Sequence, residues 1–183
     1  IEGSLEELEA NKANLSDIEY TRSLHFYHEN IRVAKAYEAI KNKNASLVEI
    51  VNSFATGTVF GARGNSGVIV SQFFKGISEG LKDKEEVNCK AFALALGNGV
   101  NFAYQSVAQP KEGTILTVLK DATKAVLDQL PIDNFDDLFK IFLTEAKLSL
   151  ERTPDFLAIL KKAGVVDSGG AGMVYFFEGI VKY

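Results

Sequence analysis

Residues 113–129 read Gly113-Thr-Ile-Leu-Thr-Val-Leu-Lys-Asp-Ala-Thr-Lys-Ala-Val-Leu-Asp-Gln129, and this stretch shows the fold class of the 183-residue chain most clearly. Its apolar side chains recur at spacings of three and four, which is typical of an amphipathic helix. The same spacing runs through residues 88–107 and 135–151, and no segment alternates in the manner of a strand. The pattern breaks at the three prolines of the chain, Pro110, Pro131 and Pro154. The sequence therefore predicts an all-α protein.

Helix-start signals divide the chain further. Ser46 with Glu49 has the spacing of a capping box, and Asn134 stands before two aspartates at a helix start. Thr153-Pro154 places a cap residue before a proline at the first helical position. Without repeats or low-complexity linkers, we expect one domain over 1–183, an antiparallel eight-helix barrel with helices over residues 2–15, 22–42, 46–60, 66–81, 88–107, 113–129, 135–151 and 154–163, and a short terminal helix from about 171.

Composition limits the classes of function. Hydrophobic residues make up 46 % and charged residues 24 %, the net charge is −4, and the basic residues are scattered, so we expect no nucleic-acid partner. No apolar run is long enough to span a bilayer and no signal peptide opens the chain, which predicts a cytoplasmic protein. Ile1 at the start indicates a fragment of a longer chain. The single cysteine, Cys89, excludes an intrachain disulfide and lies in a charged stretch typical of a solvent-facing helix start.

Glycines mark the joints that precede helices. They gather in three stretches, 57–67, 110–114 and 164–172. In Gly61-Ala-Arg-Gly-Asn-Ser-Gly67 they recur at every third position, where the N-terminus of the next helix suits a phosphate group. Arg63 would pair with phosphate, and Asn65 and Ser66 would cap the helix or donate to an oxygen. The stretch is neither a P-loop nor a dinucleotide fingerprint. The alternative is that these glycines only allow two helices to pack closely.

The other two glycine stretches carry the same two interpretations. Asp167-Ser-Gly-Gly170 has an acceptor before a flexible turn, which suits a ribose hydroxyl, an adenine edge or a metal-bound water. The simpler interpretation is an aspartate cap on the last helix. Glu112-Gly-Thr114 is equally ambiguous, with Thr114 as a cap or a phosphate donor.

His25 and His28 are the only histidines and lie three residues apart. Such a pair on one helix face can bind zinc, but a zinc site needs a third and a fourth ligand, and only Glu29 is near in sequence. We therefore expect an aromatic, half-exposed helix here and no metal site.

The three glycine stretches together resemble a known family. The segments that carry the likeness are Gly61-Ala-Arg-Gly-Asn-Ser-Gly-Val-Ile-Val-Ser-Gln72, Pro110-Lys-Glu-Gly-Thr-Ile-Leu116 and Leu160-Lys-Lys-Ala-Gly-Val-Val-Asp-Ser-Gly-Gly170. They resemble the N-terminal domain of bacterial fatty acid kinase, which is related to the nucleotide-binding subunit of dihydroxyacetone kinase. The likeness runs from about Ser46 to Tyr183 in the right order and spacing.

The resemblance implies a site and an activity. ATP would lie at one rim of the helical barrel, with its phosphates held by Phe60, Gly61, Arg63, Gly64, Asn65, Ser66 and Gly67, its pocket lined by Thr114 and Ile115, and its base and ribose closed over by Asp167, Ser168 and Gly169. In the fatty acid kinases, this domain phosphorylates the carboxylate of a fatty acid that a separate lipid-binding protein presents, with Mg²⁺ on the phosphates. Further domains beyond this fragment would allow a homodimer. A dihydroxyacetone-type kinase is a weaker alternative, because the glycine stretch has the fatty-acid-kinase form.

One departure puts catalysis in question. The family has a metal-binding loop of the type Asp-Gly-Asp-Thr-Gly-Thr-Asn between its first two helices, and residues 14–30 contain no Asp-Gly-Asp. Asp17 and Glu19 are nearby carboxylates without the glycines that would aim them at one metal. Either the protein is a degenerate, non-catalytic domain, or a loop is missing from this sequence near Tyr20-Thr21. We favour the second interpretation, and the catalytic residues stay unassigned.

Overall fold

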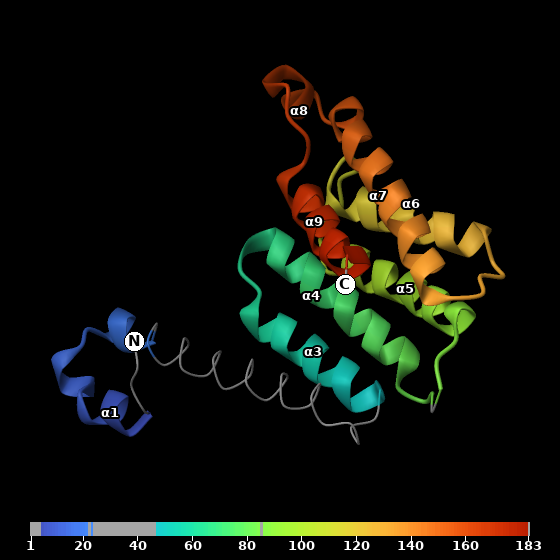
Figure 1. The fold of residues 1–183 in the computed structure, drawn as a ribbon. Coiled ribbons are helices and arrows are strands. Elements are labelled where there is room, and N and C mark those ends of the chain that lie inside the picture. The colour runs from blue at the N-terminus through green and yellow to red at the C-terminus, as the bar shows by residue number, and fades with distance from the viewer. Residues whose placement is uncertain (1–4, 22, 24–46, 85, 183) are drawn as a thin grey trace.

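The computed structural model describes residues 5–21, 23, 47–84 and 86–182, and over these ranges its regular elements are helices (Figure 1). The all-α prediction is therefore confirmed for the described residues, while most of the predicted helix 22–42 lies outside them. The elements are α1 (Leu5–Ala10), the 3-10 helix η1 (Lys12–Asn14), α3 (Leu47–Gly61), α4 (Gly64–Leu81), α5 (Cys89–Gln105), α6 (Ile115–Asp128), α7 (Phe135–Phe156), α8 (Ala158–Ala163) and α9 (Ser168–Lys182).

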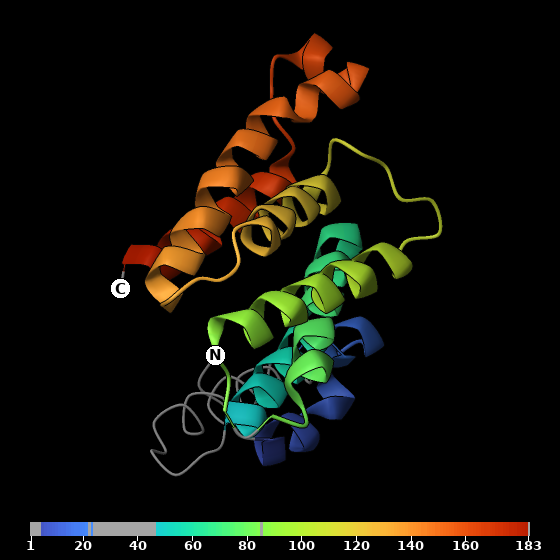
Figure 2. The same cartoon turned by 90° about the vertical axis from the view of Figure 1, so that its right-hand side faces the viewer.

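The long helices form two groups that pack on each other. In one group α4 packs between α3 and α5, and in the other α7 packs against both α6 and α9. Helix α6 joins the groups because it also contacts α5 and α4 (Figure 2). Short connections make neighbouring helices antiparallel, so several helix N-termini lie at the same end of the bundle.

The contact between α4 and α5 is the most extensive one among the described helices, and glycine makes it possible. A Cβ added to Gly76 would lie 2.7 Å from the carbonyl oxygen of Asn98, and one added to Gly99 would lie 2.7 Å from the carbonyl oxygen of Phe73. Real Cβ atoms do not approach so closely. The Asn98 side chain adds a cross-helix hydrogen bond, since its Nδ2 donates to the Gly76 carbonyl at 2.7 Å. These two glycines therefore serve the close packing of α4 on α5.

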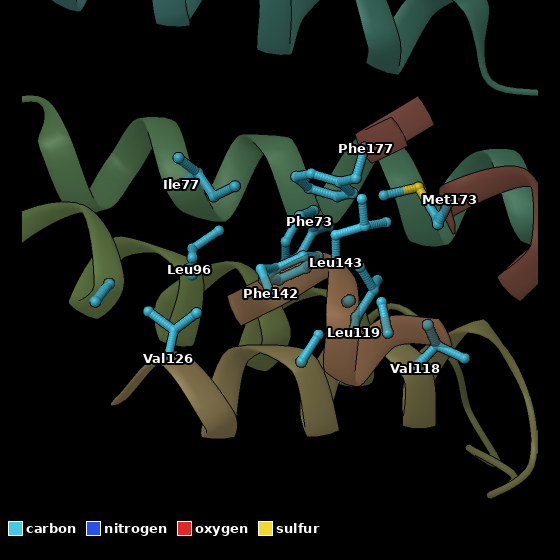
Figure 3. Packing of buried hydrophobic residues seen from close by; sticks show 14 of the residues in the cluster. Phe73, Ile77, Leu96, Val118, Leu119, Val126, Phe142, Leu143, Met173 and Phe177 are labelled. Atoms are coloured by element: carbon cyan, nitrogen blue, oxygen red, sulfur yellow. The ribbon is translucent and has the colours of Figure 1, made fainter. Parts of the chain in front are cut away.

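The core lies between the two groups. Phe73 from α4 and Phe142 from α7 are fully buried, and the Phe142 ring packs against Phe177 from α9 with ring centroids 4.3 Å apart (Figure 3). Leucines and valines from α6 complete the cluster, including Leu119 and Val126. Burial of such side chains stabilises the fold by roughly 1.5–3 kcal/mol each. Apolar faces at helical spacing thus account for the core, as the sequence predicted.

The boundary at Pro154 differs from the prediction. Helix α7 continues through Thr153 and Pro154 to Phe156, and the next helix begins only at Ala158. Proline cannot donate to the Leu150 carbonyl four residues earlier, but the Thr153 hydroxyl donates to that carbonyl at 2.7 Å. The freed acceptor is satisfied by the side chain, so the helix passes the proline instead of starting there.

Other expectations have mixed outcomes. Asn134 caps α7 as predicted, because its Oδ1 accepts from the Asp137 backbone N–H at 2.8 Å. Cys89 opens α5 but is buried, so the prediction of a solvent-facing cysteine was wrong: its side chain packs in the core cluster.

Helix α3 starts at Leu47, one residue after Ser46. Ser46, His25 and His28 lie outside the described residues. Within the described ranges, no helix combines the length and apolar character needed to cross a membrane.

Candidate functional site

The start of α4 is a tight turn without a side-chain cap. Arg63 occupies the N-cap position with extended backbone and gives no capping hydrogen bond, and Gly64 follows with a φ of 63°. That left-handed backbone angle favours glycine, because a Cβ there meets steric strain. Asn65 and Ser66 are exposed and lie inside the first turn, after the N-cap position. The interpretation that they cap the helix is therefore wrong. The helix begins two residues earlier than predicted, which moves both inside it.

Arg63 and Gly67 both contact the connection between α3 and α4. The Arg63 guanidinium donates from Nη1 to the Ala62 carbonyl at 2.7 Å and to the Phe60 carbonyl at 3.3 Å, which folds the side chain back on the end of α3. A Cβ on Gly67 would lie 3.2 Å from the Ala62 backbone, so Gly67 lets α4 start close to this connection. Phe60 and Gly61, the last residues of α3, are exposed. Gly67 therefore has a packing role in addition to any role toward a ligand.

The start of α9 is capped by Asp167. Its Oδ2 accepts from the Gly170 backbone N–H at 2.7 Å, and its carbonyl accepts from the Ala171 N–H at 2.9 Å. The helix consequently begins at Ser168, three residues before the predicted 171. Capping, the simpler interpretation of Asp167, is confirmed by this geometry. Ser168 in the first turn is exposed.

The start of α6 is held from both sides. Thr114 is the N-cap, its Oγ1 accepting from the Leu116 N–H at 3.3 Å, and Ile115 is buried in the core. Gly113 precedes it with a φ of 79°, and a Cβ there would lie 2.6 Å from the Phe156 Cβ. The Gly113 N–H donates to Thr117 Oγ1 at 2.8 Å. The turn is therefore anchored both to its own helix and to the end of α7.

Glu112 anchors the same turn through its carboxylate. It accepts from Thr117 Oγ1 at 2.7 Å and from Lys120 Nζ at 2.8 Å on α6, and from the Tyr104 hydroxyl at 3.0 Å near the end of α5. Burial alone would raise the pKa of Glu112, but hydrogen bonds from Lys120, Thr117 and Tyr104 lower it overall. Burial and the bond to Glu112 raise the pKa of Tyr104 to about 12. The carboxylate is thus ionised and triply bonded at neutral pH.

The three helix starts meet at one end of the bundle. A Cβ added to Gly169 at the start of α9 would lie 3.0 Å from Ser66 Oγ at the start of α4 and 3.4 Å from the Ile115 Cβ at the start of α6. Figure 1 shows the beginnings of these three helices on the same side of the molecule. Residues about 50 positions apart along the chain, in three separate glycine stretches, are therefore neighbours in space. A helix N-terminus carries partial positive charge and unpaired N–H donors, and here three are close together.

Thr153 connects two of these starts, a role that its interpretation as a helix cap does not predict. It is fully buried, and its Oγ1 accepts from the Asp167 N–H at 3.1 Å while donating to Leu150. A Cβ on Gly113 would lie 2.8 Å from the Thr153 carbonyl oxygen. The end of α7 thus separates and positions the starts of α6 and α9. The adjoining proline was the signal in the sequence, but it was interpreted as a helix boundary.

The described residues contain no grouping of three or more histidines, cysteines or acidic residues placed to hold a metal ion. Of the two carboxylates near Tyr20, Glu19 is engaged in a capping box: it accepts from the Ser16 N–H at 2.9 Å and from the Ser16 hydroxyl at 2.7 Å. Those bonds lower the pKa of Glu19. The residues described near Tyr20 therefore do not fit the metal loop that the resemblance implies.

Comparison with known proteins identifies the family of this chain. Residues 30–182 match the DAK2 domain family. Uncharacterized proteins of Staphylococcus saprophyticus and Staphylococcus haemolyticus are 42 % and 41 % identical to this chain over 155 residues, and one of Staphylococcus aureus USA300 is 41 % identical over 157 residues. Each alignment covers 84 % of this chain and 28 % of the relative, so the chain spans less than a third of the length of these relatives. Because the family match covers well over half of it, the chain belongs to the DAK2 domain family, that is, to the dihydroxyacetone-kinase type of helical domain.

Proposed function

We propose that this domain binds ATP with the phosphates of the nucleotide at the adjacent N-termini of α4, α6 and α9. The observation that carries the proposal is the closeness of Gly169 to Ser66 and Ile115, where an added Cβ would lie within 3.4 Å of both, so that three glycine-containing helix starts are neighbours. Aligned N-termini stabilise a polyanion because their partial charges add and their first-turn N–H groups lack helical acceptors. The predicted ligand-binding residues Gly64, Asn65, Ser66, Thr114 and Ser168 all lie in or next to these turns.

The three starts differ in what they offer a ligand. Helices α6 and α9 are capped by Thr114 and Asp167, so part of their donor capacity is engaged. The start of α4 has no side-chain cap, and it is the most exposed of the three. We therefore assign the closest phosphate contacts to residues 64–67, with the other two starts supplying positive potential and a few donors.

For the reaction, we propose transfer of the γ-phosphoryl group to the carboxylate of a fatty acid presented by a lipid-binding partner protein. The bond from the γ-phosphorus to the bridging oxygen of ADP breaks as a new bond forms to a carboxylate oxygen, which gives ADP and an acyl phosphate. What supports this substrate is the Gly61-Ala-Arg-Gly-Asn-Ser-Gly67 stretch, in its fatty-acid-kinase form. A dihydroxyacetone-type acceptor is the weaker alternative.

The described residues near Tyr20 do not fit a magnesium site. The engagement of Glu19 with Ser16 favours, as a second candidate function, a domain that binds nucleotide without transferring phosphate. The two functions differ in one readout. A kinase releases ADP from ATP when the fatty-acid-loaded partner is added, and a binding domain retains ATP unchanged.

The binding proposal is tested by adding a negative charge at the site. Asn65→Asp places a carboxylate in the first turn of α4, where it favours the helix but repels phosphate. We expect ATP affinity to fall about tenfold or more, with the melting temperature unchanged or slightly raised, since charges a few ångströms apart interact by about 1.4 kcal/mol or more near a protein surface. The matched control is Gln129→Glu at the opposite end of α6, which makes the same amide-to-carboxylate change. Isothermal titration calorimetry with equal affinities for both variants would contradict the proposal.

A further inference from the structure

The turn before α6 is held more firmly than a helix cap requires. Thr114 alone would suffice as an N-cap, yet Glu112, two residues earlier, accepts three further hydrogen bonds from two helices. The Lys120 ammonium also lies 5.8 Å from the centre of the Tyr104 ring. We call Glu112 with its partners Tyr104, Thr117 and Lys120 the Glu112 clamp.

The clamp acts on the turn at two points. The carboxylate of Glu112, the residue before Gly113, is bonded to α5 and α6. Thr117 Oγ1 accepts a hydrogen bond from the Gly113 N–H and donates its own proton to Glu112. Thr117 is buried, so its hydroxyl has no solvent alternative and these bonds specify one arrangement. Gly113 is thereby pressed against the end of α7, whose Thr153 binds the N–H of Asp167. The clamp is thus connected, through Gly113 and Thr153, to the starts of both α6 and α9.

We propose that Glu112 is a positioning residue for the phosphate site: through Gly113 and Thr153 it sets the separation of the α6 and α9 N-termini that receive the nucleotide. This inference rests on the proposed function and extends it to a residue that we do not expect to touch the ligand. A negatively charged side chain next to a phosphate site would otherwise weaken binding. Here Lys120 neutralises it, at an Nζ to Oε2 distance of 2.8 Å.

The test compares ATP affinity with stability in a small set of variants. Glu112→Ala removes all three hydrogen bonds, Tyr104→Phe removes one of them, and Glu112→Gln keeps an acceptor without the charge. We expect ATP binding to weaken about tenfold in Glu112→Ala and about two- to threefold in the two milder variants, in proportion to the bonds lost. Asp128→Ala is the matched control, because it removes the ion pair with Lys124 at the other end of the same helix. We expect unchanged affinity for it.

A double variant separates positioning from a purely structural role. If Glu112 acts through the start of α6, Glu112→Ala combined with Thr114→Ala will bind ATP no more than about twofold more weakly than the worse single variant. Tyr104→Phe is the variant that is expected to keep the fold if Glu112→Ala does not, and its affinity then decides. A lowered melting temperature with unchanged affinity in these variants would overturn the inference while leaving the proposed function intact. A wild-type chain that binds no ATP would instead overturn the proposed function, and the inference with it.

Discussion

Helix α4 uses glycine in opposite ways at its start, at Gly64, and in its C-terminal half, at Gly76. At Gly76 the surroundings are crowded, with the backbone of α5 within 2.7 Å of any added Cβ, and the backbone angle is ordinary. At Gly64 there is nothing within 4 Å, but φ is positive. Glycine is required at Gly76 because the α5 backbone is too close for a side chain, and at Gly64 because the turn has a positive φ. The packed Gly76 leaves no room for a ligand, whereas the open turn at Gly64 exposes backbone donors at a helix start, so of these two glycines only Gly64 indicates a site.

The largest effect is expected at the packed glycine, Gly76. Gly76→Val would force α4 and α5 apart, and overpacking of this kind costs about 3 kcal/mol. In a domain of this size that lowers the melting temperature by roughly 6–12 °C. Thermal unfolding followed by circular dichroism measures it. Gly179→Ala is the control, since nothing lies within 4 Å of an added Cβ there. A Gly76→Val protein as stable as the control variant would contradict the packing role.

A smaller loss of stability, together with a loss of binding, is expected at the open end. Gly64→Ala places a side chain in a left-handed conformation, which costs about 1–2 kcal/mol, and relaxation of the turn displaces the first N–H groups of α4. ATP affinity is expected to fall along with the melting temperature. Gly67 is less suitable for this comparison, because it also packs against Ala62. Unchanged affinity in Gly64→Ala, measured by calorimetry, would show that the open turn serves only the chain path.

Asp167 offers an intermediate effect on stability. Asp167→Ala removes the bond to the Gly170 N–H, and loss of such a cap costs about 1 kcal/mol. Asp167→Asn keeps an acceptor for that bond and is expected to restore most of the melting temperature. If both variants bind ATP as the wild type does, capping is the whole role of Asp167. If affinity falls in both although Asn restores stability, the carboxylate also serves the nucleotide.

The smallest effect is a dependence on pH. Because the pKa of Glu112 is lowered in the fold, its contribution to stability is complete above its usual value of 4.5 and is lost as pH falls through the folded value. The carboxylate is partly exposed, so Glu112→Gln is expected to cost less than about 1 kcal/mol at pH 7. The gap in melting temperature between wild type and variant is predicted to close in acid. A gap that is the same at pH 7 and pH 3.5 would mean that the charge of Glu112 contributes nothing.

Much of the fold was predictable because helices carry their signals locally. Apolar spacing and the Asn134 cap predicted α5, α6 and α7 closely at their starts. The helix boundary predicted at Thr153-Pro154 was wrong because the Thr153 hydroxyl donates to the Leu150 carbonyl inside the helix. A sequence pattern does not reveal such a bond. The burial of Cys89 was missed for a related reason, since charged neighbours in sequence say little about the face on which one residue lies.

The candidate site was predictable in its parts but not in its assembly. Glycine stretches before helices identified all three starts, and resemblance grouped them. Their contact through Gly169, the anchoring of Arg63 on carbonyls, and the four-residue Glu112 clamp depend on tertiary geometry. Thr117 and Lys120 looked like ordinary positions of an amphipathic helix. Only the structure shows that they bind one carboxylate.

The most direct test of the central claim is to follow backbone amide signals by NMR as ATP is added to the chain. We expect the largest shifts at residues 64–67, smaller shifts at residues 114–116 and 168–170, and almost none at Gly76 and Gly99. Shifts confined to one helix start, or spread over the α4–α5 interface, would contradict the claim that three helix starts form one phosphate site.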